Sequence, residues 1–465
     1  MNKKQKGKLS LGEKCAYGSA AIGDSVGYSL LGTYVLFFLT TVAGIQPAVA
    51  GTLTIIGAVW NALINPIIGY LSDNSRSRMG RRRPFMLGFS LPLLIVIIML
   101  FTAVEVTYTL KVIYYGFMII AYWTAFTGFF VPYYALGAEY TNNYEERTSV
   151  RSFASFFNMI GALLSMALPT VLVEAFEERG VSTSHAWTIV AGFLAVVTAT
   201  SIVITAATSK DKDRPRTNLP KQKINVITMF KEYLQVLQLK PMKWLLLVSL
   251  FFLMAYSMII ADFVYLITYK AGLGGTGVSK WMLIRCLASI ALIPLIDRLC
   301  KKVDKRRAML IIFAVAAIGL ITMRITDIGS TALLFVFVVI SSMATSSYWQ
   351  VMPAVFYDVC EYDEYETGKR REGAILSVQG LVEAAAGGIG TQILGIILQM
   401  AGFNGNAAIQ SDLAITWIFN CTTIIPILFF AVAAWALYKF PITREVYNDI
   451  VRKLGERKND EKSNS

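Results

Sequence analysis

Five charged residues lie inside long apolar stretches of this 465-residue chain. They are Asp24, Arg151, Asp262, Arg285 and Glu383. An ionised side chain at the centre of a bilayer costs about 3 kcal/mol even on lenient scales, so each of these residues is a candidate functional group. A carboxylate in this setting can accept two ligand hydroxyls. A carboxyl beside an arginine can exchange a proton, because burial and the cation shift its ionisation in opposite directions.

The composition places these charges in a membrane. Only 16% of the residues are charged and 55% are hydrophobic, whereas a soluble domain carries roughly 25% charged residues. Apolar stretches long enough to cross a hydrocarbon core of about 30 Å recur along the chain. The chain is therefore predicted to form one multi-pass membrane domain and not several soluble domains.

The apolar stretches predict an all-α protein with twelve transmembrane helices. The first six are expected at 14–42, 48–72, 84–104, 110–138, 150–175 and 186–208. The last six are expected at 243–270, 279–299, 307–326, 331–357, 373–401 and 412–439.

Most of the 43 lysines and arginines fall in the segments that such a bundle places on one side of the membrane. Basic residues favour the cytoplasmic side, so both termini are predicted to be cytoplasmic in a plasma or inner membrane. This orientation also accounts for the net charge of +13 without a nucleic-acid partner. The predicted parts are a six-helix bundle at 1–208, a central loop at 209–242 that can include an amphipathic helix, a second bundle at 243–439, and a cytoplasmic tail at 440–465.

Two sequence patterns occur once in each half. NPIIGYLSDNSRSRMGRRRP at 65–84 and IPLIDRLCKKVDKRRAM at 293–309 share a proline, an acidic residue and a basic cluster, with Pro66 and Pro294 at a spacing of 228 positions. PYYALGAEYTNNYEERTSVR at 132–151 and PAVFYDVCEYDEYETGKRR at 353–371 both run from a proline through acidic residues to arginines. This repetition predicts two parallel, pseudo-symmetric halves.

The repeated acidic and basic residues lie at the predicted cytoplasmic helix ends. Ion pairs between them can hold the halves together while that side is closed, and the alternative is that they only mark helix ends and orientation. The acidic candidates are Asp73, Glu139, Asp358, Glu361 and Asp363, and the basic candidates are Arg76, Arg78, Arg147, Arg370 and Arg371.

The sequence does not favour an enzyme. His185 is the one histidine, and the five cysteines show no CxxC spacing, so neither a metal site nor a catalytic triad is expected. The GLGGTG segment at 272–277 is short and reads as a turn. No cofactor and no bound metal are expected.

Three segments resemble one transporter family closely. NPIIGYLSDNSRSRMGRRRPFML, PYYALGAEYTNNYEERTS and DEYETGKRREGAILSVQG are similar to the glycoside-pentoside-hexuronide cation symporters. This family is typified by melibiose permease and belongs to the major facilitator superfamily. The resemblance runs from Leu11 to about Tyr438 and implies a fold of two six-helix bundles.

The resemblance implies roles for several residues. Asp24 matches a helix I aspartate that binds sugar hydroxyls, Arg151 a helix V arginine near it, and Trp349 a helix X tryptophan that lines the sugar cavity. Tyr134 stands where the family has a tryptophan on which a sugar ring stacks. The alternative for each is a packing, interfacial or orientation role. The predicted substrate-binding residues are Asp24, Tyr28, Tyr134, Arg151, Trp349 and Gln379.

The sequence departs from the family at the cation site. Asn61 and Asn65 replace two helix II aspartates, Phe130 replaces a helix IV aspartate, and Ala384 replaces a helix XI lysine. The two asparagines lie four apart on one helix face and can still ligate a cation through their amide oxygens, but they bring no charge.

Sodium coupling at the family's site is therefore in doubt, and protons are favoured as the coupling ion. Asp262 and Glu383 are candidates for the coupling role, and either can pair with Arg285. The alternative is a structural ion pair with no part in coupling.

The predicted function is secondary active symport of a sugar, glycoside, uronide or related small polar solute by alternating access. The expected partners are the solute, H+ or Na+ as coupling ion, and membrane lipid, and the protein is expected to work as a monomer. An uncoupled facilitator or exchanger, and a lipid-handling or receptor protein on the same fold, are the alternatives.

Overall fold

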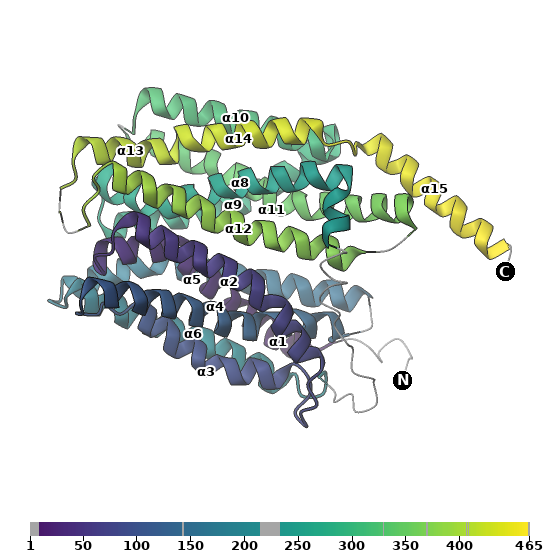
Figure 1. Ribbon diagram of the computed structural model, residues 1–465, viewed down its shortest axis with the longest axis horizontal. Helices are drawn as coiled ribbons and strands as arrows, with labels where there is room; N and C mark the ends of the chain where they lie inside the picture. Colours follow the sequence, from purple (N-terminus) through teal and green to yellow (C-terminus); the bar gives the residue numbers. More distant parts are fainter. Residues whose placement is uncertain are drawn as a thin grey trace. The chain divides into compact units, whose positions relative to one another are not determined.

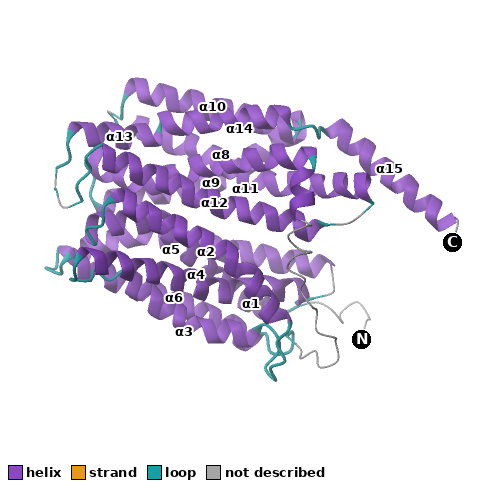
Figure 2. Cartoon of the chain, in the orientation of Figure 1, coloured by secondary structure: helices purple, strands orange, loops and turns teal. Residues whose placement is uncertain are grey.

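A computed structural model gives the arrangement of the helices (Figure 1). The structure describes the chain apart from residues 1–8, 142–143, 214–232, 329, 369–370, 406, 408 and 464–465. The described residues form helices joined by loops and contain no strand (Figure 2).

Each predicted span corresponds to helix. The first six are α1 (Leu11–Phe37), α2 (Pro47–Asp73), α3 (Arg83–Leu100), α4 (Tyr108–Glu139), α5 (Tyr144–Glu177) and α6 (Thr183–Thr208). The next five are α8 (Lys240–Tyr265), α9 (Gly275–Val303), α10 (Lys305–Thr326), α11 (Thr331–Thr367) and α12 (Glu372–Met400). The last span is formed by α13 (Asp412–Thr422) and α14 (Ile424–Lys439), and α15 (Arg444–Ser463) follows.

Within the described ranges, 11 helices are long and apolar enough to cross a membrane. The predicted span outside that set is α9, which carries Lys280 and Arg285. The break between α13 and α14 at Thr423 precedes Pro426, whose missing N–H removes a helical hydrogen bond at this point.

Some helix ends lie beyond the predicted spans. The α11 helix continues to Thr367, because charged residues beyond the apolar span do not end a helix. It stops at Gly368, which has a φ of 65° and forms a left-handed cap.

The chain divides into two compact units. The first contains Met1–Lys223, Ile260–Leu283 and Thr391–Trp417, and the second contains Ile224–Ile259, Ile284–Gly390 and Ile418–Ser465. The predicted division at the central loop falls largely on 214–232, outside the described residues, and the division into two six-helix halves stays a prediction.

In the first unit, α1 packs against α5 and α6, α2 packs against α4, and α3 packs against α4 and α6. The approach of α1 to α5 requires a glycine, because a Cβ on Gly161 would lie 2.6 Å from the carbonyl oxygen of Ile22. This contact decides which residues of α5 can reach the polar groups of α1.

In the second unit, α10 packs against α11 and α14. Its core is aromatic: the rings of Phe252 and Tyr348 stack with centroids 4.4 Å apart, and Phe252 also stacks on Phe313 and Phe430. The C-terminal α15 packs against α11.

A short π-helix extends both α1 and α8. These are η2 (Phe38–Val42) and η3 (Leu266–Lys270). In η2 the Ala43 N–H donates to the Phe38 carbonyl at 2.9 Å, and in η3 the Ala271 N–H donates to the Leu266 carbonyl at 2.9 Å. A glycine with positive φ follows each element: Gly44, with a φ of 70°, after η2, and Gly272, with a φ of 64°, after η3. The two elements lie 228 positions apart, the spacing that separates Pro66 from Pro294.

Asp213 caps the start of α3 from the far end of α6. Its carboxylate accepts hydrogen bonds from the backbone N–H groups of Arg81, Arg82 and Arg83 at 2.8 to 2.9 Å, and the residue is 2% exposed. Gly80 has a φ of 105°, and a Cβ there would lie 2.3 Å from the carboxylate. Because free N–H groups at a helix start need an acceptor, Asp213 fixes the connection between α2 and α3.

We expect Asp213→Ala to lower the apparent melting temperature of the purified protein by several degrees. Loss of a side-chain cap costs about 1 kcal/mol, and here three N–H groups lose one acceptor. Asp211→Ala, at an exposed position two residues earlier, is the matched control and should melt like the wild type. Equal melting of the two variants would show that the cap contributes nothing measurable.

Candidate functional site

Asp24 lies at the centre of a polar cluster in the first unit. It is on α1, and its carboxylate is 7% exposed. The Asn158 amide on α5 donates to it at 3.3 Å, and the Arg151 guanidinium interacts with it electrostatically. Arg151 and Asn158 are seven residues apart, which is two helical turns and the same face of α5. The cluster therefore offers an acceptor and a cation side by side.

Aromatic rings flank this pair of charges. The Arg151 guanidinium lies over the ring of Tyr134, 4.9 Å from its centroid, and that ring packs against Phe130 at 4.5 Å. Tyr134 is 42% exposed, and Tyr28, one turn after Asp24, is 49% exposed. Accessible ring faces next to a carboxylate suit a polyol, which has apolar C–H faces as well as hydroxyls.

The structure thus brings together Asp24, Tyr134 and Arg151 and adds Asn158. Tyr28 lies one turn from Asp24 on α1. Sequence reasoning missed Asn158 because an asparagine carries no charge in an apolar stretch. The signal that was present is its spacing of seven from Arg151.

The α2 asparagines bind each other and α4. The Asn65 amide donates to both the backbone carbonyl and the side-chain oxygen of Asn61, at 2.7 and 2.8 Å. The Thr127 hydroxyl donates to the same Asn61 side-chain oxygen at 2.9 Å. Nearby, the Trp60 indole donates to the Thr124 hydroxyl at 2.8 Å. The Asn61 amide oxygen therefore already accepts two hydrogen bonds, which makes it a poor ligand for a cation.

In the second unit, a glutamine holds the α12 acid. The Gln379 amide donates to the Glu383 carboxylate at 2.7 Å, one turn away on the same helix. Trp349 on α11 is 43% exposed, and its ring meets that of Tyr256 edge-on at 6.4 Å. Trp349 and Gln379 thus stay candidates for solute contacts.

Arg285 on α9 is bound by hydroxyls of α11. Its guanidinium donates to Ser341 at 3.1 Å and to Thr345 at 3.4 Å, and the residue is 4% exposed. The predicted pairing of Arg285 with Asp262 or Glu383 stays a prediction. Asp262 itself is on the part of α8 that belongs to the first unit and is completely buried.

Three of the predicted gate acids form ion pairs, each inside one unit. Asp73 pairs with Arg82, Asp358 with Lys305 at 2.7 Å, and Asp363 with Arg371, whose Nε donates at 3.0 Å. Arg82 and Lys305 were not among the predicted partners, and the predicted Arg76 and Arg78 are exposed. Glu361 is partly exposed. The side chains of Glu139 and Arg147, and all of Arg370, lie outside the described residues, and the latching role stays a prediction.

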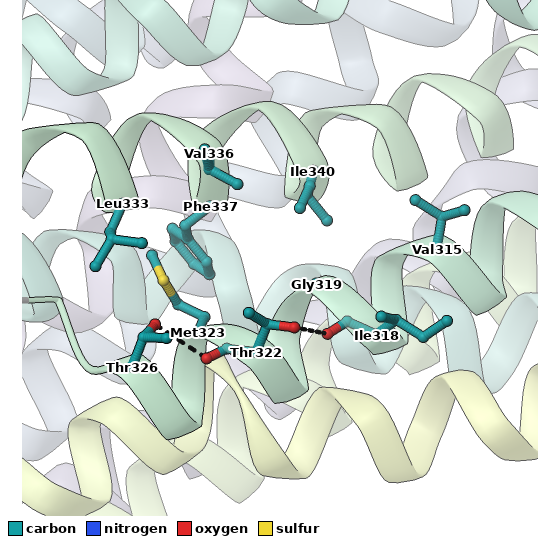
Figure 3. A pocket seen from close by; sticks show the side chains of 10 residues that line it. All are labelled: Val315, Ile318, Gly319, Thr322, Met323, Thr326, Leu333, Val336, Phe337 and Ile340. Carbon is teal, nitrogen blue, oxygen red and sulfur yellow. Dashed lines mark hydrogen bonds between the residues drawn. The ribbon is translucent and has the colours of Figure 1, made fainter.

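An apolar pocket of about 310 Å³ lies between α10 and α11 in the second unit (Figure 3). Its two hydroxyl groups, on Thr322 and Thr326, donate to carbonyls of their own helix at 2.9 and 3.0 Å. The remaining lining is aliphatic or glycine except for Met323 and Phe337. Such a pocket has no charged or free polar group with which to select a polar solute.

The described residues contain no group of three or more His, Cys, Asp or Glu that could hold a metal ion, and the five cysteines are free. The polar cluster around Asp24 acts through hydrogen bonding and charge.

Comparison with known proteins gives a family match over almost the whole chain. Residues 16–444 match the family model described as MFS/sugar transport protein. Among curated relatives, the uncharacterized symporter YnaJ of Bacillus subtilis is 27% identical over 97% of this chain and 96% of its own length. The isoprimeverose transporter of Lactiplantibacillus pentosus is 24% identical over 93% of this chain and 89% of its own. The glucuronide carrier protein homolog of Escherichia coli is 23% identical over 95% of both chains.

Solved structures support the fold. An inward-facing bacterial homologue of the human lysosomal transporter Spinster has a TM-score of 0.66 at 12% identity, over 92% of this chain and 96% of its own. The nucleoside transporter NupG has a TM-score of 0.61 at 11% identity, over 91% of this chain and 98% of its own. The all-α major facilitator fold expected from the sequence is confirmed.

We expect sodium to leave the melting temperature of the wild type unchanged, because Asn61 and Asn65 bring no charge. We expect sodium to raise the melting temperature of a variant with carboxylates at these two positions. Carboxylates bind hard cations more strongly than amides do. The Asn61→Asp/Asn65→Asp variant should therefore melt at a higher temperature in NaCl than in choline chloride of equal ionic strength. The wild type should melt at the same temperature in both salts.

Asn65→Ala is the control, since it breaks the hydrogen bonds without adding charge. A sodium-dependent shift in the wild type that Asn65→Ala abolishes would mean that the amides already bind the ion.

Proposed function

The chain belongs to the MFS/sugar transport protein family, and on that premise we propose that it is a cation-coupled symporter of a sugar, glycoside, uronide or related small polar solute. It is a multi-pass membrane transporter and not an enzyme. We propose protons as the coupling ion in preference to sodium, and alternating access as the transport mechanism.

The Asp24 cluster is the observation that carries the solute assignment. A buried carboxylate, a guanidinium and accessible tyrosine rings occur together, which is the set of groups that binds hydroxyls and apolar ring faces at once. Relatives over nearly the whole chain carry names that refer to isoprimeverose and glucuronide transport. The proposed solute contacts are Asp24, Tyr28, Tyr134, Arg151, Trp349 and Gln379, with Asn158 positioning the Asp24 carboxylate.

The choice of protons over sodium rests on the polar groups of α2, α8 and α12. Asn61 and Asn65 bring no charge and are bound to each other, which argues against sodium at this place. Glu383 and Asp262 are acids inside the spans, and acids can carry protons. We therefore assign the coupling role to Asp262, Glu383 and Arg285.

The orientation of the chain in the membrane and the cytoplasmic ion pairs are also part of the proposed mechanism. Both termini are proposed to be cytoplasmic, since basic residues gather in the connections on that side. The ion pairs of Asp73, Asp358 and Asp363 lie in these connections or at the helix ends beside them and are proposed to change partners as the protein opens and closes.

We expect Asp24→Asn to weaken solute binding at least tenfold while expression stays normal. Hydrogen bonds to a charged group contribute about 1.5 to 3 kcal/mol, and 1.4 kcal/mol corresponds to a factor of ten. A thermal-shift screen with glycosides, pentosides and uronides supplies the solute, and titration then gives Kd. Asp297→Asn removes a more exposed acid bound to Lys301 and should leave Kd unchanged. Unaltered affinity in Asp24→Asn would remove Asp24 from the site.

We expect an imposed proton gradient to drive accumulation of the solute in proteoliposomes above its external concentration. A sodium gradient of the same size should not. The measurement is uptake of labelled solute with each gradient alone and with neither. Accumulation driven by sodium alone would contradict the proton assignment. Equilibration without accumulation under both gradients would leave a facilitator or exchanger.

A further inference from the structure

Asp262 is a buried acid without a bonding partner. Its side chain is 0% exposed, and neither carboxylate oxygen has a hydrogen-bond partner within the described part of the chain. An ionised carboxylate that is neither hydrated nor paired costs many kcal/mol to bury, so such a site favours the neutral, protonated acid. This contrasts with Asp24, which has Asn158 and Arg151 beside it.

The described contacts next to Asp262 along α8 are those of Tyr265, and they are with neutral groups of the first unit. The Tyr265 phenol, three residues on along α8, is a titratable group that interacts with Asp262. From η2 the Thr40 hydroxyl is bound to the Tyr265 hydroxyl at 2.6 Å, and from α1 the Phe37 ring packs on Tyr265. The Phe403 ring of the α12–α13 connection packs edge-on against the Tyr265 ring, with centroids 5.2 Å apart.

Two charged groups at the same end of the first unit have partners other than Asp262. The Lys111 ammonium donates to the backbone carbonyl of Ala43 at 2.8 Å, and the Glu174 carboxylate accepts from the Thr276 N–H. No ion pair to Asp262 is found among the described side chains.

These contacts form a closed end of the first unit, made by η2, η3, the start of α9 and the α12–α13 connection. A Cβ on Gly405 would lie 2.0 Å from the Thr40 carbonyl oxygen, so the connection rests directly on η2. The Ser279 hydroxyl on α9 is bound to the Thr170 hydroxyl at 2.8 Å and accepts from the Val171 N–H at 3.0 Å. The Asp262 side chain has no exposed surface in this arrangement.

The repeat shows that the acid is not needed for this local structure. With the spacing of 228 positions that relates η2 to η3, Asp262 corresponds to Tyr34 on α1. The Tyr34 hydroxyl donates to the Met166 carbonyl, so the equivalent position in the first half holds a bonded neutral group. An unbonded acid at the second position therefore points to a role beyond packing.

We propose that Asp262 is a proton-binding site tied to the closed end: closure takes one proton from water onto the carboxylate, and opening returns it. This inference rests on the proposed transport function, since it requires the closed end to open during turnover. The closed form binds the proton more tightly, so falling pH favours closure and rising pH favours opening.

The test is the accessibility of a cysteine inside the closed end. Ser279→Cys is introduced into protein whose five native cysteines are replaced, and maleimide labelling is measured in nanodiscs from pH 6 to pH 8. Each rate is divided by that of the same protein unfolded in detergent at the same pH, which removes the effect of thiol ionisation. Labelling should rise with pH, by at most about tenfold per pH unit for one proton.

Asp262→Asn, which mimics the protonated acid, should label slowly at every pH. Asp262→Ser serves the same purpose if the first variant does not fold. Tyr34→Phe is the matched control at the repeat-related position and should keep the pH dependence. Labelling that is independent of pH in the parent, or that rises equally in Asp262→Asn, would overturn the proposal.

Solute exchange between equal concentrations is measured on the same proteins. If the protein exchanges solute but its labelling shows no pH dependence that requires Asp262, only this inference is contradicted. If labelling depends on pH through Asp262 but no solute is exchanged, only the proposed function is contradicted.

Discussion

The constraint on which this structure depends is that a polar group inside a hydrocarbon layer must find its partner within the protein. Helices meet this requirement for the backbone, and hydroxyls such as those of Thr322 and Thr326 meet it by bonding to carbonyls one turn earlier. The charged groups are harder to place. Arg285 is held by two hydroxyls of α11, and Asp24 by an amide of α5. Each of these contacts needs a second helix at a fixed distance, so the polar groups and the helix packing determine each other.

Close approach of α1 and α5 shows this dependence. Gly161 lets α5 come against the Ile22 carbonyl, and the same approach puts Asn158 within hydrogen-bond distance of Asp24. A larger residue at position 161 would separate the helices and leave the carboxylate without its amide. The proposed solute site is thus built by backbone packing as much as by the side chains that line it.

The sequence predicted the helices well because length and hydrophobicity decide whether a segment crosses a bilayer. It predicted the ends less well, since α11 continues through charged residues to Gly368. It also named Asp24, Arg151 and Tyr134, which lie near one another in the structure and whose role in binding stays a prediction. It missed Asn158 and Asp213, whose importance comes from the backbone and side chains they reach on other elements. The partners that Asp73 and Asp358 have in the structure, Arg82 and Lys305, were not named from the sequence, because sequence spacing gives the face of a helix but not which side chain of the next element lies opposite.

With the spacing of 228 positions between η2 and η3, Asp24 and Asp262 fall at different positions of the predicted repeat. In the frame set by η2 and η3, Asp24 corresponds to Phe252, which stacks in the aromatic core of the second unit, and Asp262 corresponds to Tyr34. Asp24 and Asp262 therefore lie ten residues apart in this frame, or about 15 Å along a helix. The first acid has a cation and an amide beside it. The second has no hydrogen-bond partner among the described residues, which suits a group that changes protonation. The predicted repeat can in this way separate solute recognition from proton binding, since its two halves share the helix ends and place these acids at different positions.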